Sequence, residues 1–318
     1  MSTDGGPTVI AVVGPTATGK SELGLRLAQV LGGEIVGADA SQLYRGMDIG
    51  TAKVPPTGRR GIAHHQLDVL DVTQEASVAA YQRHARADVN GIRSRGRHPV
   101  VVGGSGLYVR ALLDALDIPP TDPVVRRRLE EYADEVGTGV VYAELVARDP
   151  QAAEAVEPNN RRRIVRALEV IELTGRPFSA TLPRREFVHP TILVGLAVQR
   201  EVLDQRIAQR VEQMWADGLL DEVRALVGHG IRSGRTASTA IGYAQALAHL
   251  DGLVDAAGAQ EQTVAATRRL ARRQESWFRP DPRIEWVDPA DPDAVDAAVA
   301  RVVAAVGGGT VGHNGRHG

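Results

Sequence analysis

A glycine-rich octet near the amino terminus carries the clearest chemical signal in this sequence. Residues 14–21 read GPTATGKS and match the phosphate-binding pattern GxxxxGK[ST] at every required position. Gly14 and Gly19 allow the backbone to curl, so that successive N–H groups can face phosphate oxygens. Lys20 would bring a positive charge to the terminal phosphates, and the Ser21 hydroxyl could ligate Mg²⁺. The octet therefore predicts a ligand that carries a diphosphate, without saying which one.

The segments on both sides of the octet have the composition that this motif requires. Residues 8–13 form a short apolar run rich in β-branched side chains, which is typical of a buried parallel strand. Residues 22–31 have a helical pattern, and Gly32-Gly33 is expected to end the helix. A helix that begins directly after the loop adds the positive end of its dipole to a phosphate site.

Two polar residues stand where two further predicted strands end. Asp39 follows the strand expected at 34–38, and it could accept a proton, help to hold Mg²⁺, or simply bond to its own backbone. Ser105 follows the strand expected at 99–102, where many phosphoryl-transfer enzymes carry an Asp that holds Mg²⁺. Its hydroxyl could bond to a leaving-group oxygen, cap the next helix, or do both. Because ligands bind at the carboxyl ends of parallel strands, we expect Lys20, Asp39 and Ser105 to lie at one site.

Arginine is concentrated in three clusters, although the net charge of the chain is only −2. One cluster is residues 126–128, and a second places Arg162, Arg163 and Arg166 on one face of the helix expected at 161–174. A single cluster is usually a solvated helix face with ion pairs. Three Arg-rich clusters instead favour phosphate recognition, with an RNA backbone as the natural partner. The third cluster lies on or just after the helix expected at 260–278, opposite Leu270 and Trp277, and comprises Arg268, Arg269, Arg272, Arg273 and Arg279.

The overall composition is that of a globular protein with an aliphatic core, in which Trp215, Trp277 and Trp286 are expected to be buried. The chain has 318 residues, of which 43% are hydrophobic, 24% charged and only 4% aromatic. It has no cysteine, which excludes disulfides, thiolate chemistry and Cys-ligated zinc. His64-His65 lacks the spacing of a metal site, so we expect a structural role for both residues. No segment has the pattern of a signal peptide or a membrane span, and we expect a cytoplasmic monomer.

Strands and helices alternate through residues 8–116, which predicts an α/β fold with a parallel, P-loop-type sheet flanked by helices. Pro119-Pro120 interrupts this pattern, and only helices are expected in the segment that follows. A returning strand at 191–197, more helices and an edge strand at 283–287 complete the core. We therefore predict a P-loop catalytic core at 8–118 and 190–306, a helical insertion at 119–189 and a disordered tail at 307–318.

Taken together, these motifs resemble the tRNA dimethylallyltransferases, also called tRNA isopentenyltransferases. The resemblance covers about residues 8–290. The octet alone is shared by many enzymes, whereas the stretch 39–53, DASQLYRGMDIGTAK, is specific. Further matching segments are VGGSGLY at 102–108, RALEV at 166–170, IGY at 241–243, and the end of the basic helix from Arg273-Gln274 to Trp277-Phe278.

The resemblance implies transfer of a dimethylallyl group from dimethylallyl diphosphate to the exocyclic N6 amine of the adenine 3′ of the anticodon in tRNA. Asp39 would be the general base for the amine. Ser105 stands where the family commonly has Thr, and its hydroxyl would bond to the bridging oxygen of the donor. The diphosphate would bind to Gly14, Thr16, Ala17, Thr18, Gly19, Lys20, Ser21 and Arg210, with Mg²⁺ at Ser21.

The resemblance also implies which residues contact the anticodon stem-loop, and it makes the helical insertion an RNA-binding element. Ala40 stands where Ser is common in the family, which is a mild departure. The implied tRNA contacts are Asp39, Ala40, Ser41, Gln42, Ser105, Arg126, Arg162, Arg163, Ile164, Val165, Arg166, Thr239, Ile241, Gly242 and Tyr243.

Three other interpretations account for part of the sequence. A small-molecule P-loop kinase with ATP as donor explains the octet but neither the Arg-rich insertion nor the missing Asp after the 99–102 strand. A prenyltransferase acting on free adenine nucleotides would not need residues 119–185. A nucleotide-binding regulatory module does not explain why Asp39 and Ser105 should face one pocket.

Overall fold

The computed structural model describes residues 5–181 and 185–307, and these divide into two compact units. Of the described residues, unit 1 comprises 5–113 and 189–307, and unit 2 comprises 114–181 and 185–188. The predicted insertion began a few residues later, at 119. Most of the predicted tail, residues 308–318, lies outside the described residues. Within the described residues, no helix is both long enough and apolar enough to cross a membrane.

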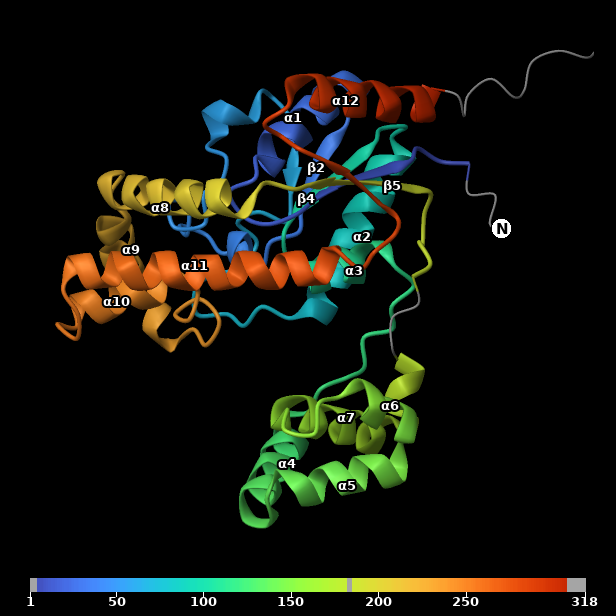
Figure 1. Ribbon diagram of the computed structural model, residues 1–318, viewed down its shortest axis with the longest axis vertical. Coiled ribbons are helices and arrows are strands. Elements are labelled where there is room, and N and C mark those ends of the chain that lie inside the picture. The colour runs from blue at the N-terminus through green and yellow to red at the C-terminus, as the bar shows by residue number, and fades with distance from the viewer. Residues whose placement is uncertain (1–4, 182–184, 308–318) are drawn as a thin grey trace, which may run out of the picture. The chain divides into compact units, whose positions relative to one another are not determined.

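A parallel six-stranded sheet forms the centre of unit 1 (Figure 1). The strand order is β3-β2-β4-β1-β5-β6, so β1 is central and pairs with β4 on one side and with β5 on the other. Parallel strands bring their carboxyl ends to one edge, which places the ends of β1, β2 and β4 close together. The strands are β1 Val9–Val13, β2 Glu34–Gly37, β3 His64–His65, β4 Pro99–Gly103, β5 Thr191–Leu196 and β6 Ile284–Val287.

Helices cover both faces of this sheet because its strands are apolar on both sides. Alternate residues of β1 point to opposite faces, and all five are buried. Ile10 and Val12 join an aliphatic core with α1 and α12. Figure 1 shows α2 and α3 on the other side of the sheet from these two helices. The bounds are α1 Lys20–Leu31, α2 Val78–Ser94, α3 Gly106–Leu113 and α12 Pro292–Gly307.

Of the four helices between β5 and β6, α9 and α10 and the end of α8 form a second apolar core, whereas α8 and α11 share a smaller one. Helices α8 and α11 run side by side, and α9 and α10 complete the group (Figure 1). The second core also buries Tyr44 and Met47, from the loop after β2. The helices therefore pack directly on the loop that carries the family-specific motif. Their bounds are α8 Arg200–Ala216, α9 Leu219–Gly228, α10 Tyr243–Leu250 and α11 Ala256–Phe278.

Unit 2 consists mainly of helices packed on a core of their own. Ile164, Val165 and Leu168 of α7 lie in this core with apolar residues of the preceding helices. Its helices are α4 Pro123–Val136, α5 Thr138–Arg148, α6 Pro150–Ala155 and α7 Arg161–Thr174. A short 3₁₀ turn at Phe178–Thr181 also belongs to unit 2. In unit 1, such turns occupy Ser41–Leu43, Pro56–Arg59 and Ile231–Ser233.

The predicted α/β class and parallel sheet are confirmed, with two additions and one correction. Strand β3 and helix α6 were not expected from the sequence. Trp277 and Trp286 are 40% and 38% exposed, so the expectation that they are core residues was wrong. The buried residues of α11 include Ala271, Gln274 and Phe278, and Trp277 is not among them.

Candidate active site

The glycine-rich loop has the curled backbone that phosphate binding requires. Gly14 has φ +135° and lies so close to β5 that a Cβ atom would stand 2.6 Å from the Leu196 carbonyl oxygen. Gly19 has φ +90° and immediately precedes α1. Ala17 also adopts a left-handed conformation, with φ +62°. The buried Thr18 hydroxyl closes the loop by donating to the Pro15 carbonyl oxygen at 2.8 Å.

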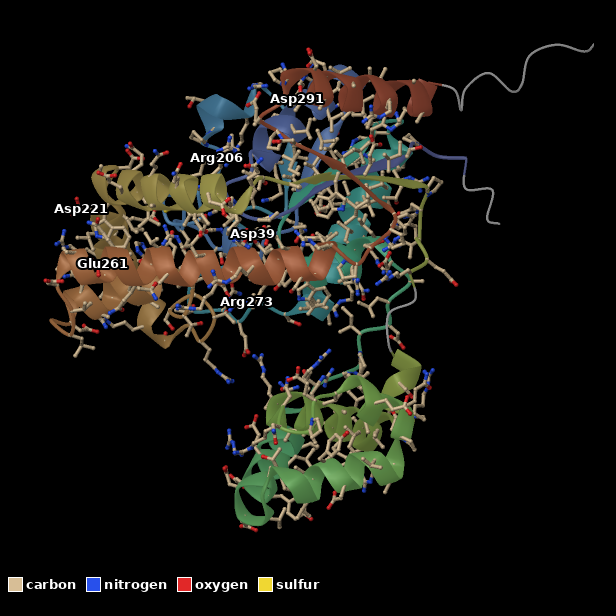
Figure 2. All side chains as sticks on the ribbon, in the orientation of Figure 1. Asp39, Arg206, Asp221, Glu261, Arg273 and Asp291 are labelled. Carbon is tan, nitrogen blue, oxygen red and sulfur yellow. The ribbon has the colours of Figure 1, made fainter. Side chains whose placement is uncertain are left out.

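Three predicted residues, Lys20, Asp39 and Arg210, come together around this loop. The Lys20 ammonium donates to the Pro15 carbonyl oxygen inside the loop. Burial lowers the pKa of Lys20 to about 7; the Asp39 carboxylate acts in the opposite direction, and Arg210 lowers the pKa further. Arg210 comes from α8, and its Nη1 atom donates to Thr16 Oγ1 at 3.4 Å. Burial lowers the pKa of Arg210, again against the effect of Asp39. Figure 2 labels Asp39 within unit 1.

Asp39 and Ser105 stand beside each other at the ends of β2 and β4. The Ser105 N–H donates to the Ala38 carbonyl oxygen at 3.4 Å. This approach needs Gly103, because a Cβ atom there would lie 2.2 Å from the same oxygen. Asp39 Oδ1 accepts the Ser41 N–H at 2.9 Å, so the local backbone bond considered for this residue is formed. Within the described residues the Ser105 hydroxyl makes no hydrogen bond, so it does not cap α3.

Two neighbouring cavities lie in this region, and only the first is lined by the loop. The first, of about 610 Å³, is lined by residues that include Gly19, Lys20 and Ser21 of the loop and Arg210. The second, of about 510 Å³, is more apolar and extends along α8 as far as Asp217. The two cavities share residues 52–55 and Arg210. Neither cavity is lined by Asp39 or Ser105.

The end of α11 packs on the loop and on the turn after β4, through two residues to which the sequence assigned no role in the site. Gln274 Oε1 accepts the Thr16 N–H at 2.8 Å. Trp277 lies against Gly106, where a Cβ atom would stand 2.8 Å from the indole. The Arg110 guanidinium lies 5.1 Å from the centre of the Trp277 ring, a cation–π contact. Both residues lie in the RQ…WF segment, which was the only sequence signal for them.

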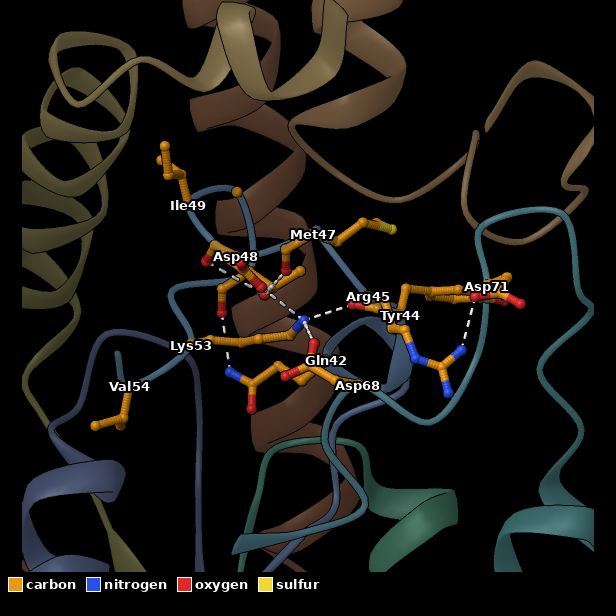
Figure 3. A network of polar contacts seen from close by, with 12 residues as sticks. Gln42, Tyr44, Arg45, Met47, Asp48, Ile49, Lys53, Val54, Asp68 and Asp71 are labelled. Atoms are coloured by element: carbon orange, nitrogen blue, oxygen red, sulfur yellow. Dashed lines mark hydrogen bonds and ion pairs between the residues drawn. The ribbon is translucent and has the colours of Figure 1, made fainter. Parts of the chain in front are cut away.

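The family-specific stretch 39–53 is held by a buried lysine (Figure 3). Only 2% of the Lys53 side chain is exposed, and its ammonium donates to Asp48 Oδ1 at 2.8 Å and to Asp68 Oδ1 at 2.5 Å. It also donates to the Tyr44 carbonyl oxygen. Gln42 Nε2 donates to the Thr51 carbonyl oxygen at 3.0 Å, which ties the start of the stretch to its end.

The predicted RNA contacts of unit 2 separate into an exposed and an internal group. Arg162 and Arg163 are exposed and have no ion-pair partner within the described residues. Arg126 and Arg166 both pair with the fully buried Glu169, at 2.5 Å and 2.9 Å. Ile164 and Val165, which were predicted as contacts, are buried in the core of the unit. Their side chains are therefore not accessible to RNA in this conformation, because the apolar face of α7 packs inward.

The predicted segment 239–243 also contains both exposed and buried residues. Thr239 is exposed and Ile241 is half-buried. Gly242 is buried with φ +90°, and α10 begins at the next residue. Tyr243 is fully buried, and its hydroxyl donates to the carboxylate of Glu222. The Tyr243 side chain therefore faces the protein interior and not a ligand.

Comparison with known proteins agrees with this geometry. Residues 42–281 match the sequence profile of the IPP transferase family. The chain belongs to this family. It is 58% identical to a tRNA dimethylallyltransferase of Streptomyces avermitilis over 290 residues, which are 91% of this chain and 93% of that protein. It is also 58% identical to the enzyme of the same name from Thermobifida fusca, over 93% of this chain and 94% of that one.

Solved structures of IPP transferases show the same fold. A full-length tRNA isopentenylpyrophosphate transferase from Bacillus halodurans matches with a TM-score of 0.71 at 36% identity, over 96% of this chain and 98% of that chain. A eukaryotic dimethylallyltransferase, described as acting on tRNA, matches with a TM-score of 0.79 at 28% identity. That match covers 95% of this chain and 79% of the eukaryotic chain.

Proposed function

We infer that this protein is a tRNA dimethylallyltransferase. It transfers a dimethylallyl group from dimethylallyl diphosphate to the N6 amine of the adenine 3′ of the anticodon, and it releases diphosphate. The observation that carries this proposal is the position of Asp39, which interacts electrostatically with Lys20 and Arg210 beside a curled P-loop, in a chain of the IPP transferase family. High identity to enzymes of that name disfavours the small-molecule kinase.

The phosphate side of the reaction would be handled by the loop and its two cations. Breaking the bond between the allylic carbon and oxygen leaves negative charge on the diphosphate. The N–H groups of residues 17–21, the Lys20 ammonium and the Arg210 guanidinium would stabilise this charge. Because burial depresses the pKa of Lys20, a bound diphosphate would restore its full positive charge. The Ser105 hydroxyl, which is free within the described residues, would donate to the bridging oxygen.

The acceptor side would be handled by Asp39. The exocyclic amine of adenine is a weak nucleophile because its lone pair is delocalised into the ring. As the new carbon–nitrogen bond forms, the amine must lose a proton, and the Asp39 carboxylate is the acceptor we propose. An adenine stacked in the anticodon loop cannot reach an enclosed donor, so it would have to be splayed out of the loop.

Mg²⁺ fits the residues present and would screen the charge of the diphosphate. The Ser21 hydroxyl lies at the start of α1 beside Lys20, is exposed, and makes no hydrogen bond within the described residues. The described residues contain no group of three acidic or histidine side chains that could hold a metal. We therefore propose that Ser21 and the diphosphate oxygens would be the ligands, with water completing the shell.

The exposed arginines of unit 2 would bind the RNA backbone. Arg162 and Arg163 project from α7 without ion-pair partners in the described part of the chain, so both guanidinium groups are available to bind phosphate groups of RNA.

We also propose that the protein acts as a monomer in the cytoplasm. Light scattering after size-exclusion chromatography would test the oligomeric state.

One incubation tests the proposal. The protein, Mg²⁺, dimethylallyl diphosphate and an anticodon stem-loop RNA are combined, and the RNA is digested to nucleosides for mass analysis. We expect one adenosine to gain the mass of a dimethylallyl group in place of hydrogen, and no change when ATP replaces the donor. A transferred phosphoryl group without an alkylated base would contradict the proposal and favour the kinase. Free AMP as acceptor tests the nucleotide prenyltransferase.

A further inference from the structure

Glu222 of α9 binds a turn of the polypeptide that lies far from it in the sequence. Its Oε2 atom accepts the N–H groups of Asp48 at 3.0 Å and Ile49 at 2.8 Å. Its Oε1 atom accepts the N–H of Gly50 at 3.4 Å. Three consecutive amides therefore converge on a single carboxylate. Hydrogen bonds to an ionised acceptor are about twice as strong as neutral ones, so the turn is held firmly.

The bound turn belongs to the wall of the candidate donor site. Asp48 and Ile49 line the second cavity, and Ala52 and Lys53, at the end of the same turn, line both cavities. Figure 3 shows the Asp48 side chain pointing toward the Lys53 ammonium. The turn also accepts the Gln42 side chain through the Thr51 carbonyl oxygen. The position of residues 48–53 therefore determines the position of a cavity wall and of the Gln42 side chain, which is implied to contact tRNA.

The same carboxylate holds a second implied RNA-contacting segment. The Tyr243 hydroxyl donates to Glu222 Oε1, and the tyrosine ring lies against Gly50, where a Cβ atom would be only 2.5 Å from the ring. Burial and the nearby carboxylate raise the pKa of Tyr243 far above its ordinary value. The phenol therefore stays protonated and remains a donor. Tyr243 is the last residue of the 239–243 segment, so Glu222 fixes the point at which that segment enters α10.

We propose that Glu222 is a positioning residue for prenyl transfer, holding the donor-cavity wall at 48–50 and the RNA-contacting segment at 239–243 in one arrangement. This inference rests on the proposed function, because it assigns Glu222 a role in that reaction. Glu222 lines neither cavity and would not touch the reacting atoms. Its effect would be transmitted through the backbone of the turn on one side and through the Tyr243 side chain on the other.

The experiment measures two dissociation constants for each of three variants, one for the donor analogue and one for the RNA. Dimethylallyl thiolodiphosphate, a slow-reacting donor analogue, is titrated with Mg²⁺ by calorimetry, and a labelled anticodon stem-loop is titrated by anisotropy. Glu222→Gln keeps the side-chain length but removes the charge and turns an amide NH₂ toward backbone donors. Tyr243→Phe removes the hydroxyl that donates to Glu222 but keeps the ring that lies against Gly50 and the three backbone bonds of Glu222. Asp221→Asn is the control, because Asp221 is exposed on the same helix and pairs with Arg224 (Figure 2).

The expected results differ between the variants. Glu222→Gln should weaken both the donor analogue and the stem-loop by about 10-fold. Tyr243→Phe should weaken the stem-loop by about 5-fold and leave donor binding within 2-fold of wild type, because the three backbone bonds remain. Asp221→Asn should match wild type in both. The melting temperature is recorded for all variants. A substitution that only destabilises the fold would lower the melting temperature and, in Tyr243→Phe, would weaken the binding of both ligands equally.

Two outcomes would overturn the inference. In the first, Glu222→Gln folds and binds both ligands as wild type does. In the second, Tyr243→Phe weakens donor and stem-loop equally; this variant decides the matter if Glu222→Gln fails to fold. The transfer assay with wild-type protein distinguishes failure of this inference from failure of the proposed function. If wild type transfers the group and both variants bind normally, only the role of Glu222 is refuted. If wild type does not transfer the group, the proposed function is refuted.

Discussion

Asp39 uses one carboxylate oxygen for local structure and has a second oxygen for chemistry. The bond from the Ser41 N–H to Oδ1 is an Asx turn, which orients the carboxylate at the end of β2. The electrostatic effects of Asp39 on Lys20 and Arg210 then place it beside the cations of the loop. The two interpretations of this residue from the sequence, a structural turn and a reactive group, are therefore compatible.

Replacing Asp39 by Ala should separate chemistry from binding. Loss of a general base typically costs a factor of about 10² to 10⁴ in turnover. We therefore expect kcat to fall at least about 100-fold, while the dissociation constant of the stem-loop changes by less than about 3-fold. Single-turnover kinetics and RNA titration measure the two quantities. Equal losses in both would mean that Asp39 acts in RNA binding and not as a base.

Some residues of the site could be predicted from the sequence and others could not. The loop residues 14–21 and the ends of β2 and β4 were located by local patterns of glycine and apolar residues. Gln274 and Glu222 were missed because their partners lie 258 and more than 170 positions away, at Thr16 and at the 48–50 turn. Such contacts depend on how helices pack against the loops, which no local pattern encodes.

At the scale of elements, the end of α11 supports the phosphate loop through Gln274. Gln274→Leu should preserve most of the packing but leave the Thr16 N–H without its acceptor. We expect the KM for dimethylallyl diphosphate to rise about 10-fold, because a lost buried hydrogen bond costs about 1 to 3 kcal/mol. Gln262→Leu, on an exposed position of the same helix, is the control. An unchanged KM in both variants would show that α11 does not support the loop.

The arginines of helix α7 are expected to have two different roles, RNA binding and stability. The double variant Arg162→Ala, Arg163→Ala should weaken stem-loop binding and reduce the salt slope by about 1 to 2, because each phosphate contact contributes about 0.7 to 0.9. Arg166→Ala should instead lower the melting temperature, because it deprives the buried Glu169 of a partner. Arg128→Ala serves as control, since Arg128 is already paired with Glu172. A salt slope unaffected by the double variant would refute RNA binding by this helix.

Elements with strong periodicity were predictable, whereas short ones were not. Strand β3 has only two residues, His64 and His65, so no alternation exists to reveal it. Helix α6 has six residues between Asp149 and Val156, too few for a helical stripe. The exposure of Trp277 was mispredicted because apolar residues usually mark the core, and here the core side of α11 carries Gln274.

At the scale of the whole molecule, the sheet edge contains a charged network that makes stability depend on pH. His65 of β3 lies between Asp88 and Glu34, at 3.7 Å and 2.8 Å, and Arg95 also pairs with Glu34. Hydrogen bonding to Asp88, and then to Glu34, raises the pKa of His65 against the effect of burial. Burial alone would raise the pKa of Glu34, but its bonds to His65 and Arg95 outweigh this effect and lower it.

The network should stabilise the protein most between about pH 4.5 and 6.5, the ordinary pKa values of Glu and His. Because the folded pKa of His65 is raised, its contribution is complete below pH 6.5 and is lost as pH rises through the folded value. Because the folded pKa of Glu34 is lowered, its contribution to stability is complete above pH 4.5 and is lost as pH falls through the folded value. The melting temperature of His65→Gln should therefore lie below wild type by on the order of 2 °C at pH 6 and approach it by pH 9. His229→Gln, at an exposed position, is the control, and a pH-independent difference would contradict the account.

The central claim is that the loop after β1 grips an allylic diphosphate whose reactive carbon faces Asp39. The most direct measurement is a crystal structure of the protein with Mg²⁺, dimethylallyl thiolodiphosphate and an anticodon stem-loop. We predict diphosphate oxygens on Lys20 and on the loop N–H groups, and the adenine N6 atom about 3 to 3.5 Å from the reactive carbon and within hydrogen-bond reach of Asp39. A reactive carbon remote from Asp39, or an adenine bound elsewhere, would contradict the claim.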